Sequence, residues 1–142
     1  IFNIGVNLMN KIIFVVAGVI IFDKKILCVQ RGVNKYKYIS EKFEFPGGKI
    51  EEGETDVNAL RREILEELSM DINIDKFFMA VDYQYPDFFI NMKVYLCSSK
   101  SNQLLLSEHL SYHWLSVNKL KNLDWAAADI PVVKKLLSNN IF

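Results

Sequence analysis

Three glutamates on a predicted helix are the residues best suited to chemistry in this sequence. Glu63, Glu66 and Glu67 occupy positions i, i+3 and i+4, so a helix projects them within an arc of about 100°. Three like charges this close destabilise an isolated helix. A hard divalent cation would offset the repulsion, because such cations take oxygen ligands. The alternative is a solvated acidic face that Arg61 and Arg62 stabilise.

A glycine-rich segment, Pro46-Gly47-Gly48-Lys49, precedes the helix. Glycine lets the backbone approach a ligand closely, and the Lys49 ammonium suits a phosphate oxygen. The segment lacks the spacing of a P-loop. Alone it indicates no more than a hairpin turn, but beside a row of glutamates it favours a site for a phosphate-bearing ligand.

Residues 48–70 as a whole resemble the Nudix box, the sequence signature of a family of hydrolases. The signature is Gly-x5-Glu-x7-Arg-Glu-U-x-Glu-Glu-x-Gly-U, where U is a bulky apolar residue, and eight of its nine specified positions match here. The exception is Ser69, where the family has glycine. Glycine suits a helix end with positive φ, and serine can adopt that conformation at a cost of about 1 kcal/mol.

The resemblance implies a fold and an activity. The implied fold class is α/β (α+β): a Nudix-like α/β/α sandwich with a mixed β-sheet and a loop–helix–loop catalytic motif. The implied activity is the Mg²⁺-dependent cleavage of a free nucleoside triphosphate into a nucleoside monophosphate and pyrophosphate, with Mn²⁺ as a substitute metal. Metal ions in such a site neutralise phosphate charge and acidify a water molecule, which a glutamate deprotonates.

The same resemblance identifies candidate metal and base residues. Glu63, Glu66 and Glu67, together with the Gly48 carbonyl, match the metal-binding positions. Glu63 is the first choice for the general base, and Glu67 for the tightest metal contact. Glu108 matches an additional metal-site or base glutamate found in a mobile loop of the MutT-like branch. A solvated loop residue is the alternative for Glu108.

Further candidate residues follow from the resemblance. Arg62 and Glu54 match an internal ion pair that orients the catalytic glutamate, and Lys49 matches a phosphate contact. Arg31, at a strand end, matches a nucleotide contact, although an ordinary surface arginine is equally consistent with the pattern. The basic and aromatic residues 34–38 form either an exposed loop or a segment that closes over substrate.

Phe45, Tyr85 and Asp129 match the positions that bind the base in the MutT-like branch. Aromatic rings stack on any base, and both rings could instead be plain core residues. An ionised Asp129 only accepts hydrogen bonds, so it favours a base edge that donates, such as the cytosine amine. As an alternative, Asp129 caps the helix that begins at Pro131.

The segment at residues 125–131 also resembles members described as CTP pyrophosphohydrolases. The leading substrate is therefore (d)CTP or a modified cytosine nucleotide. Oxidised dGTP comes second, because an 8-oxopurine also donates a hydrogen bond at N7. The remaining alternatives are another diphosphate such as ADP-ribose, and a catalytically silent nucleotide sensor. The intact glutamates argue against the sensor, since sensing needs no such cluster of charge.

Strands and helices must hold these residues in place. Apolar and β-branched runs predict strands at residues 12–22, 26–30, 43–45, 76–85, 89–97 and 112–115, with hairpin turns at 23–25 and 86–87. One helix is predicted over residues 56–68, after Thr55 as N-cap, and shorter ones at 117–121 and 131–137. Helical spacing predicts that Val57, Leu60, Ile64 and Leu68 face the core.

Length and composition limit what else the protein does. The 142 residues predict a single domain over 9–142, with residues 1–8 as a leader or vector-derived segment. Equal numbers of basic and acidic residues, 17 each, disfavour a polymeric nucleic acid partner. Cys28 and Cys97 are predicted to be buried thiols. The longest apolar run is shorter than the roughly 20 residues of a membrane span. We therefore expect a cytoplasmic monomer or homodimer that acts on free nucleotide without a membrane partner.

Overall fold

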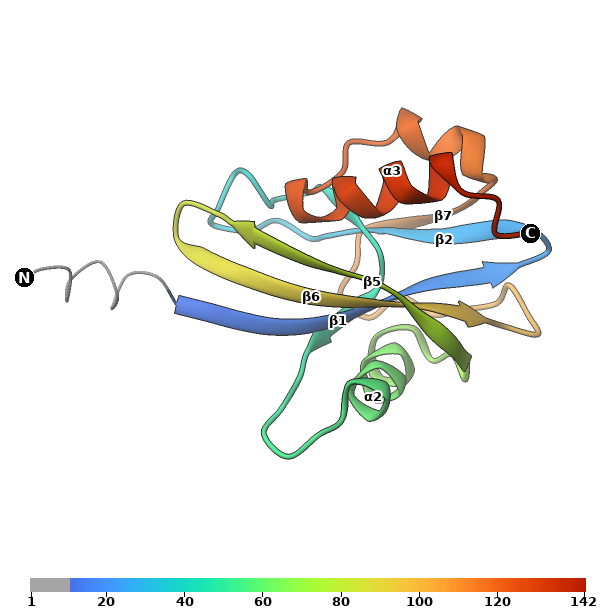
Figure 1. The fold of residues 1–142 in the computed structure, drawn as a ribbon, viewed down its shortest axis with the longest axis horizontal. Coiled ribbons are helices and arrows are strands. Elements are labelled where there is room, and N and C mark those ends of the chain that lie inside the picture. Colours follow the sequence, from blue (N-terminus) through green and yellow to red (C-terminus); the bar gives the residue numbers. More distant parts are fainter. Residues whose placement is uncertain (1–10) are drawn as a thin grey trace, which may run out of the picture.

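The fold is a mixed β-sheet with helices on both faces (Figure 1). The computed structural model describes residues 11–142, and the predicted leader at residues 1–8 lies outside them. The strands are β1 (Lys11–Phe22), β2 (Lys25–Gln30), β3 (Phe43–Glu44), β4 (Gly47–Lys49), β5 (Asn73–Gln84), β6 (Phe88–Ser98) and β7 (Ser111–Leu115). The helices are α2 (Asp56–Leu68) and α3 (Ile130–Ser138), with the 3-10 segments η1 (Val117–Asn122) and η2 (Ala127–Asp129). Within this described part, no helix is long and apolar enough to cross a membrane.

The central strand of the sheet is β1. One of its edges pairs in parallel with β6, from Lys11 opposite Phe88 to Ile21 opposite Ser98. Its other edge pairs antiparallel with β4 and then with β2. Both β3 and β7 pair with β2, and β5 pairs with β6. A parallel pair among antiparallel ones makes the sheet mixed, as the sequence predicts.

One face of the sheet is covered by α2 (Figure 1). Leu60, Ile64 and Leu68 of this helix pack against Val16 and Ile20 of β1. These two strand residues share a face because successive side chains of a strand point in opposite directions. The packing fixes the helix that carries the predicted acidic residues relative to β1.

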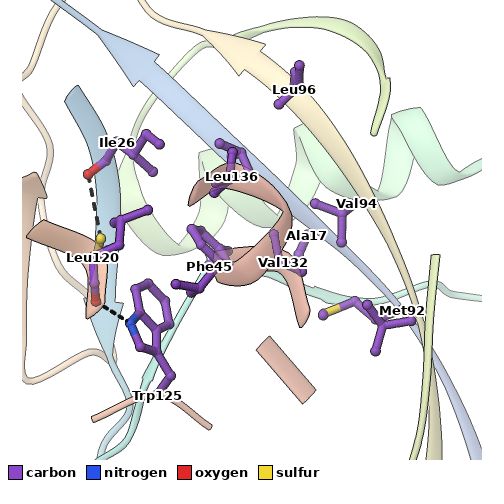
Figure 2. Close-up of a cluster of buried hydrophobic side chains, with 14 residues drawn as sticks. Ala17, Ile26, Phe45, Met92, Val94, Leu96, Leu120, Trp125, Val132 and Leu136 are labelled. Carbon is purple, nitrogen blue, oxygen red and sulfur yellow. Dashed lines mark hydrogen bonds between the residues drawn. The ribbon is translucent and has the colours of Figure 1, made fainter. Parts of the chain in front are cut away.

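The opposite face of the sheet carries α3 and a second apolar core (Figure 2). Val132 and Leu136 of α3 pack here with Phe45 and Trp125. The rings of Phe45 and Trp125 are stacked with centroids 4.6 Å apart. The Trp125 indole N–H donates to the Leu120 carbonyl oxygen at 2.7 Å. This core therefore ties the connection between β3 and β4 to the C-terminal part of the chain.

Both ends of α2 are formed as the sequence predicts. Thr55 Oγ1 accepts a hydrogen bond from the Asn58 N–H at 3.2 Å. Ser69 has a left-handed backbone conformation (φ 54°, ψ 36°), and its N–H donates to the Leu65 carbonyl oxygen at 3.1 Å. Serine thus ends the helix in the conformation that glycine adopts most easily. Val57 is only partly buried, so the fully buried stripe of α2 begins one turn later than predicted.

Two elements differ from their predictions. Residues 47–49 form strand β4 rather than a loop. A Cβ atom on Gly47 would overlap the Val16 carbonyl oxygen, so glycine allows this segment to lie close against β1. The helix predicted at 117–121 is the 3-10 segment η1. The remaining predicted elements form, with ends that shift by up to three residues.

Cys28 and Cys97 are free, buried thiols, as predicted. Each belongs to a different one of the two apolar cores. Burial raises the pKa of each thiol to about 12. Because the thiolate is the reactive form, both residues act as small apolar side chains of the core.

Candidate active site

A cavity of about 990 Å³ lies where β4, α2, the segment after β2 and the segment before β7 meet. Nine of the twelve predicted site residues line it: Arg31, Phe45, Gly48, Lys49, Glu63, Glu67, Tyr85, Glu108 and Asp129. The other three, Glu54, Arg62 and Glu66, do not line it. The fold therefore gathers most of the predicted residues around one space of the size that small-molecule sites have.

The carboxylate of Glu63 lies directly against the backbone of Gly48. A Cβ atom on Gly48 would overlap this carboxylate, so only glycine permits the contact. Gly48 belongs to β4, which pairs with β1, and the neighbouring Ile64 of α2 is fixed in the core. The two glycines therefore serve close packing within the protein: Gly47 against β1, and Gly48 against Glu63.

Arg62 is hydrogen-bonded to three glutamates. Its Nε and Nη2 atoms donate to the two carboxylate oxygens of Glu54 at 2.7 and 2.9 Å. Its Nη1 atom donates to Glu63 Oε1 and to Glu66 Oε1, each at 3.0 Å. The hydrogen bonds from Arg62 lower the pKa of Glu54 to about 2, and those to Glu54 raise the pKa of Arg62. The predicted Arg62–Glu54 pair is present, and it anchors Glu63.

Five glutamates line the cavity, and four of them interact electrostatically, because the charges of Glu44, Glu63 and Glu108 act on Glu67. We call these four residues the acidic wall. Burial raises the pKa of Glu67 to about 7, with contributions from the charges of Glu63, Glu108 and Glu44, while His109 acts in the opposite direction. A dication among such oxygens would favour the ionised carboxylates. The chemistry of the acidic wall therefore fits Mg²⁺ or Mn²⁺.

The glutamates do not form a ready-made coordination shell. Among residues 11–142, no group of three or more Asp, Glu, His or Cys side chains is placed together closely enough to hold a metal ion. Arg62 instead pairs with both Glu63 and Glu66. Glu66 turns toward Arg62 with 56% of its side chain exposed, and it lies outside the cavity. The fit to a metal ion thus rests on Glu63, Glu67, Glu108 and the backbone of Gly48.

Basic side chains also line the cavity: Lys11, Arg31, Lys35 and Lys49. Lys49 is exposed at the rim, and its carbonyl oxygen accepts a hydrogen bond from Arg62 Nη2 at 3.2 Å. Arg31 Nη1 donates to Glu44 Oε1 at 3.3 Å. The cavity therefore combines carboxylates for a metal ion with cations that can bind the oxygens of a phosphate chain.

Glu44 and His109 belong to this cavity, although the sequence pattern predicts a role for neither. His109 Nε2 lies 3.3 Å from Glu44 Oε2, and 6% of the histidine side chain is exposed. One feature of the sequence could have indicated a role for Glu44: it is a carboxylate between Phe43 and Phe45 in a predicted strand. The spacing of His109 to the glutamates is not that of a metal ligand, so only the fold shows that it lies there.

Asp129 is a buried carboxyl group in the cavity wall, with 5% of the residue exposed. Its Oδ1 accepts a hydrogen bond from the Phe45 N–H at 3.0 Å. Asp129 occupies the N-cap position of α3, as the alternative predicts, but its side chain makes no capping hydrogen bond to that helix. Burial, with the charge of Glu44, raises the pKa of Asp129 well above its usual value. A raised pKa favours the neutral carboxyl group, which both donates and accepts, over the ionised one, which only accepts.

Phe45 and Tyr85 line the cavity, but other aromatic residues occupy much of their surface. Phe45 is 3% exposed and stacks on Trp125. Tyr85 is 5% exposed, its ring stacks on Tyr38, and its hydroxyl accepts a hydrogen bond from the Ala128 N–H at 2.9 Å. Both rings therefore serve as packed parts of the wall, and neither offers a wide open face to a base.

The sequence and the fold both have relatives among known proteins. Residues 13–136 match the family model of the NUDIX domain. The chain is 33% identical over 121 residues to the 8-oxo-dGTP diphosphatase of Buchnera aphidicola subsp. Acyrthosiphon pisum (strain APS), covering 85% of this chain and 94% of that protein. It is 29% identical over 128 residues to the CTP pyrophosphohydrolase of Escherichia coli (strain K12), covering 90% and 93%. A solution structure of the Nudix hydrolase MutT from methicillin-resistant Staphylococcus aureus 252 is similar with a TM-score of 0.72 and 38% identity, covering 93% of this chain and 100% of that chain.

Proposed function

This chain belongs to the Nudix family of hydrolases, and from that premise we propose that it cleaves a free nucleoside triphosphate, with Mg²⁺, into a nucleoside monophosphate and pyrophosphate. One observation carries the proposal: a single cavity joins Glu63 and Glu67, the basic residues and Asp129. A nucleotide has a phosphate chain, which the basic residues and a metal ion on the two glutamates can bind. It also has a base, which Asp129 can bind. The names of the relatives support a triphosphate substrate, because they are a diphosphatase of 8-oxo-dGTP and a pyrophosphohydrolase of CTP.

In this proposal Gly48, Glu63, Glu67 and Glu108 hold the metal ion through oxygen atoms. A bound Mg²⁺ supplies neutralising charge for the phosphate oxygens and increases the acidity of water. Glu63 accepts the proton of the attacking water. Arg62 donates to Glu63 Oε1, so this ion pair orients the carboxylate that takes the proton.

The basic residues bind the phosphate chain. Lys49 lies at the exposed rim, where its ammonium can contact a phosphate oxygen. Arg31 is held by Glu44 through one end of its guanidinium, at Nη1. The guanidinium has five N–H donors in a fixed plane, so the other end can bind a phosphate oxygen while Glu44 orients the group.

We propose (d)CTP or a modified cytosine nucleotide as the leading substrate and oxidised dGTP as the second. The likeness of residues 125–131 to CTP pyrophosphohydrolases and the Escherichia coli relative support the first. The Buchnera relative supports the second. The raised pKa of Asp129 favours its neutral form, and that form suits either base, because one carboxyl group can donate to an acceptor or accept from a donor.

A panel of nucleotides with Mg²⁺ tests the proposal, with pyrophosphate and phosphate release measured separately. We expect pyrophosphate from (d)CTP or 8-oxo-dGTP, and a Glu63→Gln variant whose kcat is lower by a factor of roughly 10²–10⁴. Glu52→Gln is the matched control, because Glu52 is an exposed carboxylate of the loop between β4 and α2, outside the cavity. Preferred cleavage of ADP-ribose would overturn the triphosphate assignment. Nucleotide binding without turnover would instead indicate a sensor.

A further inference from the structure

A row of aromatic rings joins the segment between β2 and β3 to the turn between β5 and β6, which lie side by side (Figure 1). The ring of Tyr38 stacks on Tyr36 and on Tyr85, with centroids 5.3 and 5.2 Å apart and interplanar angles of 20° and 21°. The Tyr38 hydroxyl donates to Asp87 Oδ2 at 2.6 Å. Tyr38 and Asp87 are 49 positions apart, so this contact links two distant parts of the chain.

The segment between β2 and β3 is folded by its own hydrogen bonds. The Asn34 N–H donates to Ser40 Oγ, and the Tyr36 N–H donates to Asn34 Oδ1, each at 2.9 Å. The N–H groups of Ile39 and Ser40 both donate to the Tyr36 carbonyl oxygen. The segment is therefore a compact unit, and its contact with Asp87 fixes the position of the whole unit.

Tyr38 stands behind the cavity wall. Tyr36 and Tyr85 line the cavity, but Tyr38 does not. The Tyr85 hydroxyl accepts the Ala128 N–H, directly before Asp129 in the chain. Tyr38 therefore connects one wall of the cavity, at Tyr36, to another wall that includes Tyr85 and Asp129. Desolvation and the hydrogen bond to Asp87 raise the pKa of Tyr38 to about 12.

We propose that Tyr38 is a positioning residue that determines which bases the cavity accepts, because its hydrogen bond to Asp87 fixes the spacing between the Tyr36 wall and the Tyr85 wall. The inference rests on the proposed function, since it takes the ligand to be a nucleotide. Two walls at a fixed distance from each other discriminate between bases by size, whereas Glu63 and Glu67 set the rate of cleavage. Loss of the Tyr38 hydroxyl should therefore change KM and base preference without changing kcat.

Tyr38→Phe is the direct test, because it removes the hydroxyl and keeps the stacked ring. We expect KM for the preferred nucleotide to rise about fivefold, the worth of one hydrogen bond, with kcat within about twofold of the wild type. The ratio of kcat/KM between cytosine and 8-oxoguanine nucleotides should move toward one. Tyr112→Phe is the matched control, since Tyr112 is an exposed tyrosine of β7 outside this cavity, and it should change neither quantity.

Asp87 lines the cavity itself, so it could affect the ligand directly as well as through its hydrogen bond with Tyr38. Two variants of Asp87 separate these effects. Asp87→Asn keeps an acceptor for the Tyr38 hydroxyl, so it should stay closer to the wild type than Asp87→Ala does. The double variant Tyr38→Phe/Asp87→Ala should be no worse than Asp87→Ala alone, because both changes remove the same hydrogen bond. Additive effects on KM would overturn the inference.

An unchanged KM and base preference in a folded Tyr38→Phe protein would also overturn it, as would a loss confined to kcat. If the wild type cleaves no triphosphate, the proposed function fails, and calorimetric titration with CMP and dGMP then decides the inference. Tyr38→Phe must in that case bring the two affinities closer together. Equal affinity ratios in the wild type and the variant would refute the role of Tyr38 independently of catalysis.

Discussion

At the scale of single residues, the proposed role of Asp129 in binding the base depends on its protonation state. Its Oδ1 accepts the Phe45 N–H, so the second carboxyl oxygen is the atom left to meet a base. Burial raises the pKa of Asp129 well above its usual value. A protonated oxygen donates a hydrogen bond, whereas an ionised one only accepts. Base preference should therefore depend on pH.

Asp129→Asn tests this by replacing a titratable donor with a permanent one. We expect the variant to keep the wild-type ranking of cytosine and 8-oxoguanine nucleotides at the acidic end of the measured range, because asparagine resembles the neutral acid. With rising pH the wild-type ranking should change as Asp129 ionises, and the variant's should change less. The measurement is the ratio of kcat/KM between cytosine and 8-oxoguanine nucleotides across this pH range. The variant controls for ionisation of the substrate, which affects both proteins alike. A ranking reversed by asparagine at the lowest pH would contradict a neutral Asp129.

Site residues within one local motif could be predicted from the sequence, and residues joined only by the fold could not. Glu63, Arg62 and Gly48 follow from fixed spacings along a single loop and helix. The contact of Glu44 with His109 spans 65 positions and depends on the pairing of β2 with both β3 and β7. No local spacing reveals such a contact.

At the scale of elements, α2 is the helix that the sequence predicts residue for residue. Its start has a capping threonine, its buried face has a regular apolar stripe, and its end has a residue able to adopt positive φ. These signals are local, so they can be read without the fold. Strand β4 is the opposite case, because two glycines and a lysine have low strand propensity. It forms because β1 offers an edge that Gly47 can approach.

Ser69→Gly should stabilise the protein, because Ser69 has a φ of 54°, which glycine adopts without a Cβ penalty. We expect the free energy of unfolding to rise by up to about 1 kcal/mol, since the greater freedom of glycine in the unfolded chain offsets part of the gain. Urea denaturation of both proteins measures the change. Ser69→Ala is the paired control and should bring no such gain, because alanine keeps the Cβ atom at the same positive φ. A less stable Ser69→Gly protein would show that the helix end depends on the serine side chain.

At the scale of the whole molecule, the net charge is zero, but carboxylates are concentrated around the cavity. The folded, metal-free protein keeps a proton on Glu67 between the ordinary pKa of 4.5 and about 7, where the unfolded chain has lost it. Its contribution to stability is therefore complete below pH 4.5 and disappears as the pH rises through 7. Asp129 acts in the same direction. Glu54 acts in the opposite one, because its contribution is present above its ordinary pKa and is lost as the pH falls toward 2.

Thermal unfolding with and without Mg²⁺, at about pH 6 and about pH 8, tests most directly whether the acidic wall is a metal site. We expect the Tm of the metal-free protein to be lower at the higher pH. Mg²⁺ should raise Tm by a few degrees there and much less at the lower pH, because a dication binds the ionised carboxylates. Glu67→Gln should remove most of both effects, while Glu52→Gln keeps them. A wild-type Tm that neither Mg²⁺ nor Mn²⁺ raises at the higher pH would contradict the assignment of the acidic wall as a metal site.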